Sequence, residues 1–284
     1  MAGTTSDLSD LFNKIYEQAL FVAREQNLMT QLVTNYNGQG LAQRKLGIYP
    51  EVSAAEVAEG VDYSGGVGWS KSTQMTLTPK VVKAQTIVTQ SQIATDPDNT
   101  MMDAGEELGM AVSTKIDKDL LTLFGGFSSD KGTAGSALTI ARCAAGLAVI
   151  QNNNFRMPWY FVLHPFGWYD IWTELGQPAT EKAFLGETAN DALRQYAVGE
   201  FMGAQWFVSS NIAIDSDDDA VSAVFTREAL AFDVRKTAEL MTDEDPSIGG
   251  RGWELDMEAW YAVGERRDGA GVALTHDATE PTGV

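Results

Sequence analysis

The stretch 99–127 constrains the fold more than any other, because its apolar residues recur every three or four positions. They are Met101, Ala104, Leu108, Val112, Ile116, Leu120, Leu123 and Phe127. This spacing places them on one stripe of an α-helix and leaves the other face polar. Gly125 and Gly126 offer the left-handed residue that commonly ends a helix. We therefore expect a helix of about 25 residues, roughly 37 Å long, that lies along other elements.

The overall composition permits a large core and argues against nucleic-acid binding. The chain has 284 residues, of which 44% are hydrophobic, and this suits one large domain or two small ones. Its formal charge of −19 disfavours contact with phosphates, which needs clustered lysine and arginine. The single cysteine, Cys143, lies in an alanine-rich run and is expected to be a small core residue. No signal peptide or run of ~18 apolar residues is visible, so we expect synthesis in the cytoplasm and no membrane partner.

Periodicity predicts further elements on both sides of the long helix. A first helix is expected from Ser6 or Asp7 to about Arg24. The glycine-rich segment 60–70 is too long for a tight turn and is expected to be a protruding loop between two strands. Downstream we expect helices at 138–150 and 166–175, and strands at 159–163, 206–210, 221–226, 252–263 and 271–274. The chain is therefore expected to be α+β, with mostly antiparallel strands.

Two segments come close to ligand-binding motifs, and neither fits. The segment 65–72 misses the P-loop pattern because Ser70 stands where a glycine is needed, and because no buried strand precedes it and no helix follows. The acidic run 215–219 lacks the central glycine and the closing glutamate of a calcium loop, since Ala220 and Thr226 stand there. A solvated loop between strands is the simpler interpretation of this run. We expect no cofactor and no metal.

The titratable residues show no catalytic pattern. His164 and His276 are not at metal-ligand spacing and lie in no nucleophile motif, and His164 is expected to be a hydrogen-bonded structural residue. The acids 243–245 precede Pro246 and are interpreted as a turn. We therefore expect no catalytic residue and no enzymatic activity.

The order of these segments resembles the major capsid proteins of tailed phages, which have the HK97 fold. The resemblance rests on Thr76-Leu77-Thr78-Pro79-Lys80, on the segment from Val88 to Asp96, and on the long helix that ends at Gly125-Gly126. A glycine-rich loop precedes them, and a buried aromatic strand leading to His164-Pro165 and a terminal strand pair follow. Each motif is loose, but their order covers essentially the whole chain.

The resemblance implies an HK97-like fold with four parts. Residues 1–42 would form an N-terminal arm, and 43–90 the extended loop with its flanking strands. Residues 91–132 and 253–284 would form the peripheral domain with its spine helix, and 133–252 the axial domain. It also implies self-assembly into hexamers and pentamers of a shell that encloses DNA without reading its sequence. Scaffolding, portal or decoration proteins would be further partners, and the virion capsid the location. Because the chain starts at its arm helix, either separate scaffolding or a cleaved precursor is expected.

Four loop residues are candidates for contact between subunits: Tyr63, Val67, Trp69 and Lys71. Large apolar side chains among glycines can add little to the subunit's own core, so burial on a neighbour is expected. Lys71 could also be a cross-linking lysine of the kind known in part of the family, but we expect no covalent cross-links.

Two other functions remain open at this point. One is an encapsulin-like compartment of the same fold that encloses protein. The other is an acidic α+β hydrolase or carbohydrate-binding domain, in which Trp159, Trp168 and Trp172 would line a sugar site. The second alternative predicts a stable monomer, whereas the first predicts a shell.

Overall fold

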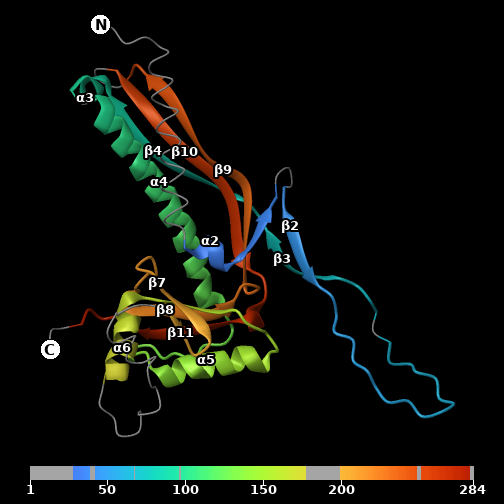
Figure 1. Cartoon of the computed structure of the whole chain (residues 1–284). Coiled ribbons are helices and arrows are strands. Elements are labelled where there is room, and N and C mark those ends of the chain that lie inside the picture. The colour runs from blue at the N-terminus through green and yellow to red at the C-terminus, as the bar shows by residue number, and fades with distance from the viewer. Residues whose placement is uncertain are drawn as a thin grey trace.

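The computed structural model describes residues 28–38, 42–66, 68–95, 97–176, 199–247 and 251–281. Two sheets form the body, and a long two-stranded extension projects from it (Figure 1). The helix expected before Arg24 lies outside the described residues, as does Val67.

The long helix is α4 (Pro97–Leu121), and its 25 residues match the expected length. Leu108, Val112 and Leu120 of the expected stripe are buried. Two polar residues expected on the exposed face, Ser113 and Asp117, are buried as well. Asp117 accepts hydrogen bonds from the amides of Leu28 and Met29, at 3.3 and 3.2 Å, at the start of the short helix α2 (Met29–Leu32). The polar face was mispredicted here because α2 packs on it.

The end of α4 also differs from the prediction. The chain tightens into the 3₁₀ helix η1 (Thr122–Gly126), and the following Phe127 is extended. The described glycines with positive φ do not include Gly125 or Gly126, so no left-handed residue ends this helix. A 3₁₀ turn satisfies the last carbonyl groups instead.

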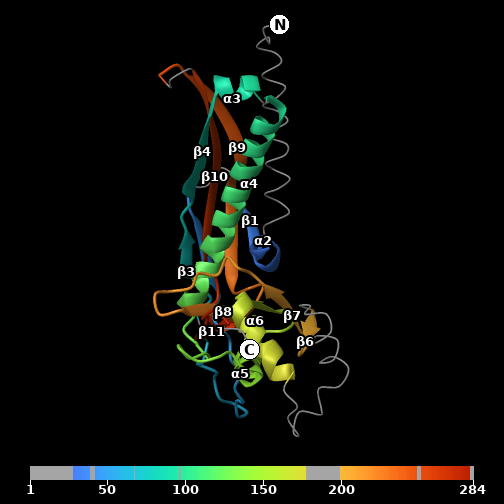
Figure 2. The same ribbon diagram turned by 90° about the vertical axis from the view of Figure 1, so that its left-hand side faces the viewer.

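The first sheet lies along α4, as Figures 1 and 2 show. Its strand order is β1 (Thr34–Asn37), β9 (Leu230–Asp245), β10 (Gly252–Glu265) and β4 (Lys80–Thr89). β1 runs parallel to β9, and the other pairs are antiparallel. The short helix α3 (Gln90–Thr95) joins β4 to α4. Alternate residues of β4, such as Val82 and Val88, pack toward the core, because successive side chains of a strand point to opposite faces.

The second sheet has five strands and carries two helices. Its order is β11 (Gly271–Asp277), β8 (Asp219–Thr226), β5 (Trp159–Leu163), β7 (Ala204–Val208) and β6 (Glu200–Phe201). The helices are α5 (Ile140–Asn152) and α6 (Pro165–Gly176). Cys143 on α5 is fully buried and free, as predicted, and burial raises the pKa of its thiol to about 12.

Strand β9 was missed by the sequence analysis. It pairs with β10 along its length, so it belongs to the sheet beside α4, although it falls within the expected axial range 133–252. Conversely, β11 lies in the second sheet, although it falls within the expected peripheral range. The acids 243–245 continue β9 rather than forming a turn, and the turn follows at Pro246 and Ser247.

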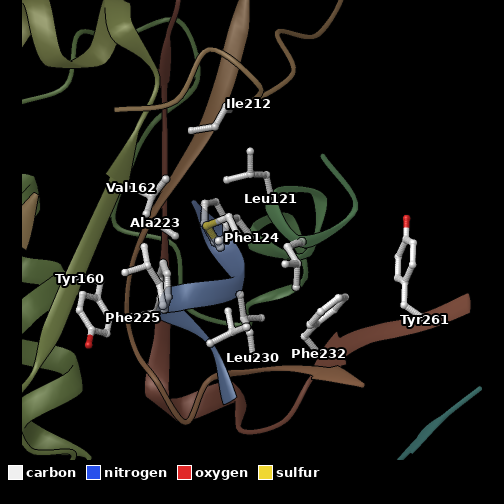
Figure 3. Packing of buried hydrophobic residues seen from close by; sticks show 14 of the residues in the cluster. Leu121, Phe124, Tyr160, Val162, Ile212, Ala223, Phe225, Leu230, Phe232 and Tyr261 are labelled. Carbon is white, nitrogen blue, oxygen red and sulfur yellow. The ribbon is translucent and has the colours of Figure 1, made fainter. Parts of the chain in front are cut away.

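One hydrophobic cluster joins the two sheets where α4 ends (Figure 3). Phe124 of η1 is fully buried, and its ring centroid lies 5.4 Å from that of Phe225 on β8. Leu230 and Phe232 of β9 belong to the same cluster. Each buried side chain of this size contributes about 1.5–3 kcal/mol. The cluster therefore fixes the two sheets to one another.

Candidate assembly surfaces

The extension is built on the antiparallel pair β2 (Arg44–Ile48) and β3 (Ser72–Leu77). The segment 49–71 between these strands runs far from the body (Figure 1). Its large apolar side chains are exposed: Tyr49 52%, Val52 61%, Val57 42%, Val61 62%, Tyr63 45% and Trp69 66%. Within the described part of this segment, apolar surface is therefore left in water at many positions, as is typical of surfaces that bind a partner.

The exposed aromatic residues of the loop are ordered by local contacts. Tyr49 and Trp69 stack with ring centroids 5.0 Å apart and an interplanar angle of 9°. The Tyr63 hydroxyl lies 3.4 Å from the carbonyl oxygens of Ser53 and Gly65. The sequence analysis missed Tyr49, because it lies outside the glycine-rich segment, and only its pairing with Trp69 across the two arms of the loop marks it.

The predicted contact residues do not form one cluster with Trp69. Lys71 is exposed just before β3, whereas Tyr63 lies near the middle of the segment 49–71 in the sequence. No salt bridge joins Lys71 to another described residue. The role of Tyr63, Trp69 and Lys71 in subunit contact stays a prediction.

A buried charge network anchors the root of the extension to the first sheet. Asp233 on β9 is fully buried, and its Oδ2 accepts hydrogen bonds from Arg44 on β2 at 3.0 Å and from Arg235 at 2.9 Å. The Arg44 guanidinium also lies over the ring of Tyr36, 4.9 Å from its centroid. Arg235 donates to the carbonyl of Gly38, where a Cβ would come within 2.5 Å of the guanidinium carbon. A larger residue at position 38 would have to displace the Arg235 and Asp233 side chains.

Apolar packing supports the same root. Leu77 of β3 is buried against Ala231 of β9 and Ala262 of β10, with Leu46 and Met75 packed around them. Met75 and Leu77 therefore face one side of β3, as residues two apart on a strand do. The contacts of β2 and β3 with the first sheet therefore hold the base of the loop, although the loop has no hydrophobic core of its own.

The face of the first sheet that points away from α4 is a second candidate surface. Val81 on β4 and Trp260 on β10 are neighbours across the strands, and they are 59% and 41% exposed. Ile87 and Met241 are exposed on the same sheet, at 49% and 40%. Between them Lys83 pairs with Asp256 at 2.6 Å, and this hydrogen bond raises the pKa of the lysine. The surface combines apolar side chains with charges already paired within the chain.

The described residues offer no group of three or more histidine, cysteine, aspartate or glutamate side chains that could hold a metal ion. In the acidic run, the Asp215 carboxylate accepts the amides of Asp217 and Asp219, both at 2.9 Å, so it shapes the loop itself. Burial lowers the pKa of His164 and of His276, which keeps both neutral at pH 7. His164 accepts the amide of Phe166 at 3.2 Å through Nδ1 and is the structural residue expected. None of the described helices is both long and apolar enough to cross a membrane.

Two of the three tryptophans proposed for a sugar site, Trp159 and Trp168, pack in the core of the second sheet. Trp168 is 4% exposed and packs against Trp206, with ring centroids 6.0 Å apart, in the core of the second sheet. Trp159 packs against the same core, and its Nε1 lies 3.4 Å from the carbonyl of Phe155. These side chains stabilise the subunit, which removes the basis for a carbohydrate site.

No protein-family model and no curated protein matches the sequence. The fold, in contrast, is similar to many solved structures. The capsid structure of the cyanophage P-SCSP1u is 11% identical, with 89% of each chain covered and a TM-score of 0.66. The mature capsid of bacteriophage PhiM1 is 14% identical, with 90% of this chain and 88% of that chain covered and a TM-score of 0.63.

A protein compartment is similar to nearly the same degree. The SrpI encapsulin complex from Synechococcus elongatus PCC 7942 is 12% identical, with 90% of this chain and 89% of that chain covered and a TM-score of 0.60. The HK97-like α+β fold expected from the order of the motifs is thus confirmed over nearly the whole chain. At this level of identity the likeness shows the fold alone.

Proposed function

We propose that this chain is a non-enzymatic structural subunit that assembles into a closed shell, namely the icosahedral capsid around the double-stranded DNA of a tailed phage. The observation that carries the proposal is the extended loop, in a chain with the HK97-like fold. Its anchored root and exposed tip suit an element that binds a neighbouring copy. The charge of −19 suits a container that encloses DNA without binding it tightly.

The second candidate is a compartment shell that encloses protein. It is favoured by the likeness to the encapsulin and to a virus-like particle from Pyrococcus furiosus, which is 11% identical with 92% of this chain and 98% of that chain covered and a TM-score of 0.61. The subunit architecture of the two candidates is the same, so the contents of the particle distinguish them. Scaffolding, portal and decoration proteins are partners that only the phage proposal requires.

The test is to purify the chain after expression and to image it by negative-stain electron microscopy. Closed particles of uniform size support a shell-forming subunit, whereas a monomer at every protein concentration contradicts it. Particles from the native source are then treated with nuclease and their contents extracted. Protected double-stranded DNA supports the capsid, and a co-purifying protein cargo without DNA supports the compartment.

A further inference from the structure

A pocket at the junction of the two sheets concentrates positive charge in this acidic chain. Four of the 20 lysines and arginines line it: Arg156, Arg227, Arg266 and Arg267. The pocket is formed by the segment after α5, the turn between β8 and β9, the end of β10 and the start of β1. In a chain of net charge −19, four arginines around one pocket are a local excess of positive charge.

Contacts within the chain hold three of these arginines in place. The Arg227 Nε donates to the carbonyl of Val33 at 3.1 Å, and Arg267 pairs with Glu228 at 2.9 Å. The backbone amides of Arg266 and Arg267 both donate to the carbonyl of Ala229, at 2.6 and 3.1 Å. These bonds hold the backbone at Arg266 and Arg267 and the side chains of Arg227 and Arg267. The wall of the pocket is therefore formed within the subunit itself.

The remaining arginine, Arg156, is exposed and forms no salt bridge with the described residues. Arg266 has only a long contact of 3.5 Å to the Thr34 hydroxyl. A guanidinium carries five donors and stays charged at any physiological pH. These two side chains therefore have donors available for carboxylates, the groups that arginine binds best in pairs of parallel hydrogen bonds.

The extended loop supplies matching carboxylates. Between residues 46 and 70 the chain has four acids, Glu51, Glu56, Glu59 and Asp62, and no lysine or arginine. All four are exposed, and Glu51 lies at the edge of its own chain's arginine pocket. Beyond Glu51 the loop runs away from the body (Figure 1), and its other three acids do not line that pocket.

We propose that the arginine pocket receives the acidic tip of the extended loop from a second copy of this chain. The contact joins two different surfaces, and a repeated contact of this kind forms a ring when its rotation closes. The inference rests on the proposed shell-forming function and names the surface on which the loop docks. A nucleic-acid strand suits this chain less well, because contact with a phosphate backbone needs many clustered lysines and arginines, and the net charge is −19.

The test is a charge exchange between the two surfaces. The pocket variant is Arg156→Glu with Arg266→Glu, the loop variant is Glu59→Arg with Asp62→Arg, and the combined variant carries all four changes. Lys80→Glu with Lys131→Glu is the matched control, since it makes the same charge change at exposed lysines outside the pocket. Thermal unfolding of each unassembled subunit first establishes that the fold is intact.

Light scattering then gives the protein concentration at half-assembly. We expect this concentration to rise by about tenfold or more in the pocket and loop variants. The combined variant is expected to return to within about threefold of the wild type, and the lysine control to stay there. A pocket variant that assembles like the wild type overturns the proposal, and so does a combined variant that stays as defective as its parents. Wild-type protein that never assembles contradicts the proposed function itself, together with this contact.

Discussion

At the scale of single residues, Asp233 is the group on which the base of the extension depends. Its buried carboxylate compensates the charges of Arg44 and Arg235. Asp233→Asn keeps the size but leaves Arg235, whose side chain is 5% exposed, without its counter-charge. Removing one partner of a buried ion pair costs about 3–5 kcal/mol, so we predict a loss of this size in the free energy of unfolding. Urea denaturation of the unassembled subunit measures it.

The matched control for this variant is Lys115→Ala. Lys115 pairs with Asp119 at 2.7 Å on the exposed surface of α4, one helical turn away. Such pairs contribute about 0.3–0.5 kcal/mol, so the control should unfold almost as the wild type does. If Asp233→Asn costs no more than Lys115→Ala, the network does not anchor the extension.

The two histidines predict how stability depends on pH. Burial depresses the pKa of His164 and of His276 below the usual 6.5, with mutual repulsion adding to the effect at His164. Each stays neutral in the folded state and takes up a proton on unfolding. Their contribution to stability is therefore full above pH 6.5 and is lost as the pH falls through the lowered pKa. We predict that the free energy of unfolding decreases as the pH is lowered from 6.5.

The variant His164→Asn tests this assignment, because an amide oxygen can still accept the Phe166 amide but does not titrate. The slope of the free energy of unfolding against pH should decrease by an amount that corresponds to the uptake of up to about one proton on unfolding. Burial raises the pKa of Asp117 and Asp170, which favours the folded state on acidification near their usual 3.8, so the measurement belongs above about pH 5. An unchanged slope in the variant rules out His164 as its source.

At the scale of elements, the extended loop should be dispensable for folding and necessary for assembly. Replacing residues 52–68 by a short Gly-Ser linker keeps β2, β3 and the anchor at Asp233. The change in loop-closure entropy is only about 1 kcal/mol or less, so the thermal unfolding midpoint should hardly move. Assembly should fail, because the exposed side chains of Val52, Val57, Val61 and Tyr63 are lost.

Trp69→Ala tests the base of the loop, which the deletion keeps, since it removes one side of the stack with Tyr49. An aromatic interface anchor is worth about 1–3 kcal/mol, so assembly should need about tenfold or more protein. Size-exclusion chromatography with light scattering measures both variants. Normal shells from the deletion, or a deletion that unfolds the subunit, would show that the loop does not join subunits.

The elements that the sequence predicts well are those whose pattern is local. The stripe through Leu108, Val112 and Leu120 predicts α4, and the continuous apolar run 159–163 predicts β5 with its observed bounds. Strand β9 was missed because its outer half, residues 236–245, mixes charged, polar and apolar residues without a clear period-two pattern. What makes it a strand is its pairing with β10 along its length, and such long-range pairing leaves little local trace.

The candidate surfaces were predictable only in part for the same reason. Isolated aromatic residues among glycines mark Trp69, whereas the role of Asp233 depends on Arg44, which is distant in the sequence. Likewise, the sequence predicts Asp117 only as a polar residue on the exposed face of a helix. Its role depends on the amides of Leu28 and Met29, which donate hydrogen bonds to it. Contacts between segments far apart in the chain define these residues, and a single sequence does not contain them.

At the scale of the whole molecule, the charge of −19 predicts the effect of salt on assembly. Subunits repel one another over distances comparable to or longer than the Debye length of about 8–10 Å, so added salt screens the repulsion. Charge pairs in direct contact are screened less. We therefore predict that the protein concentration at half-assembly falls between low and physiological salt. A steady rise over this range would mean that attractive ion pairs dominate.

The central claim is that this chain builds a shell from copies of itself, and sedimentation velocity of the purified wild-type protein tests it most directly. We predict a large, uniform species whose fraction grows with protein concentration, with smaller rings or subunits below the assembly threshold. Trp69→Ala should lower the fraction of the large species at the same protein concentration. A monomer near 30.7 kDa at every concentration and salt would contradict the account.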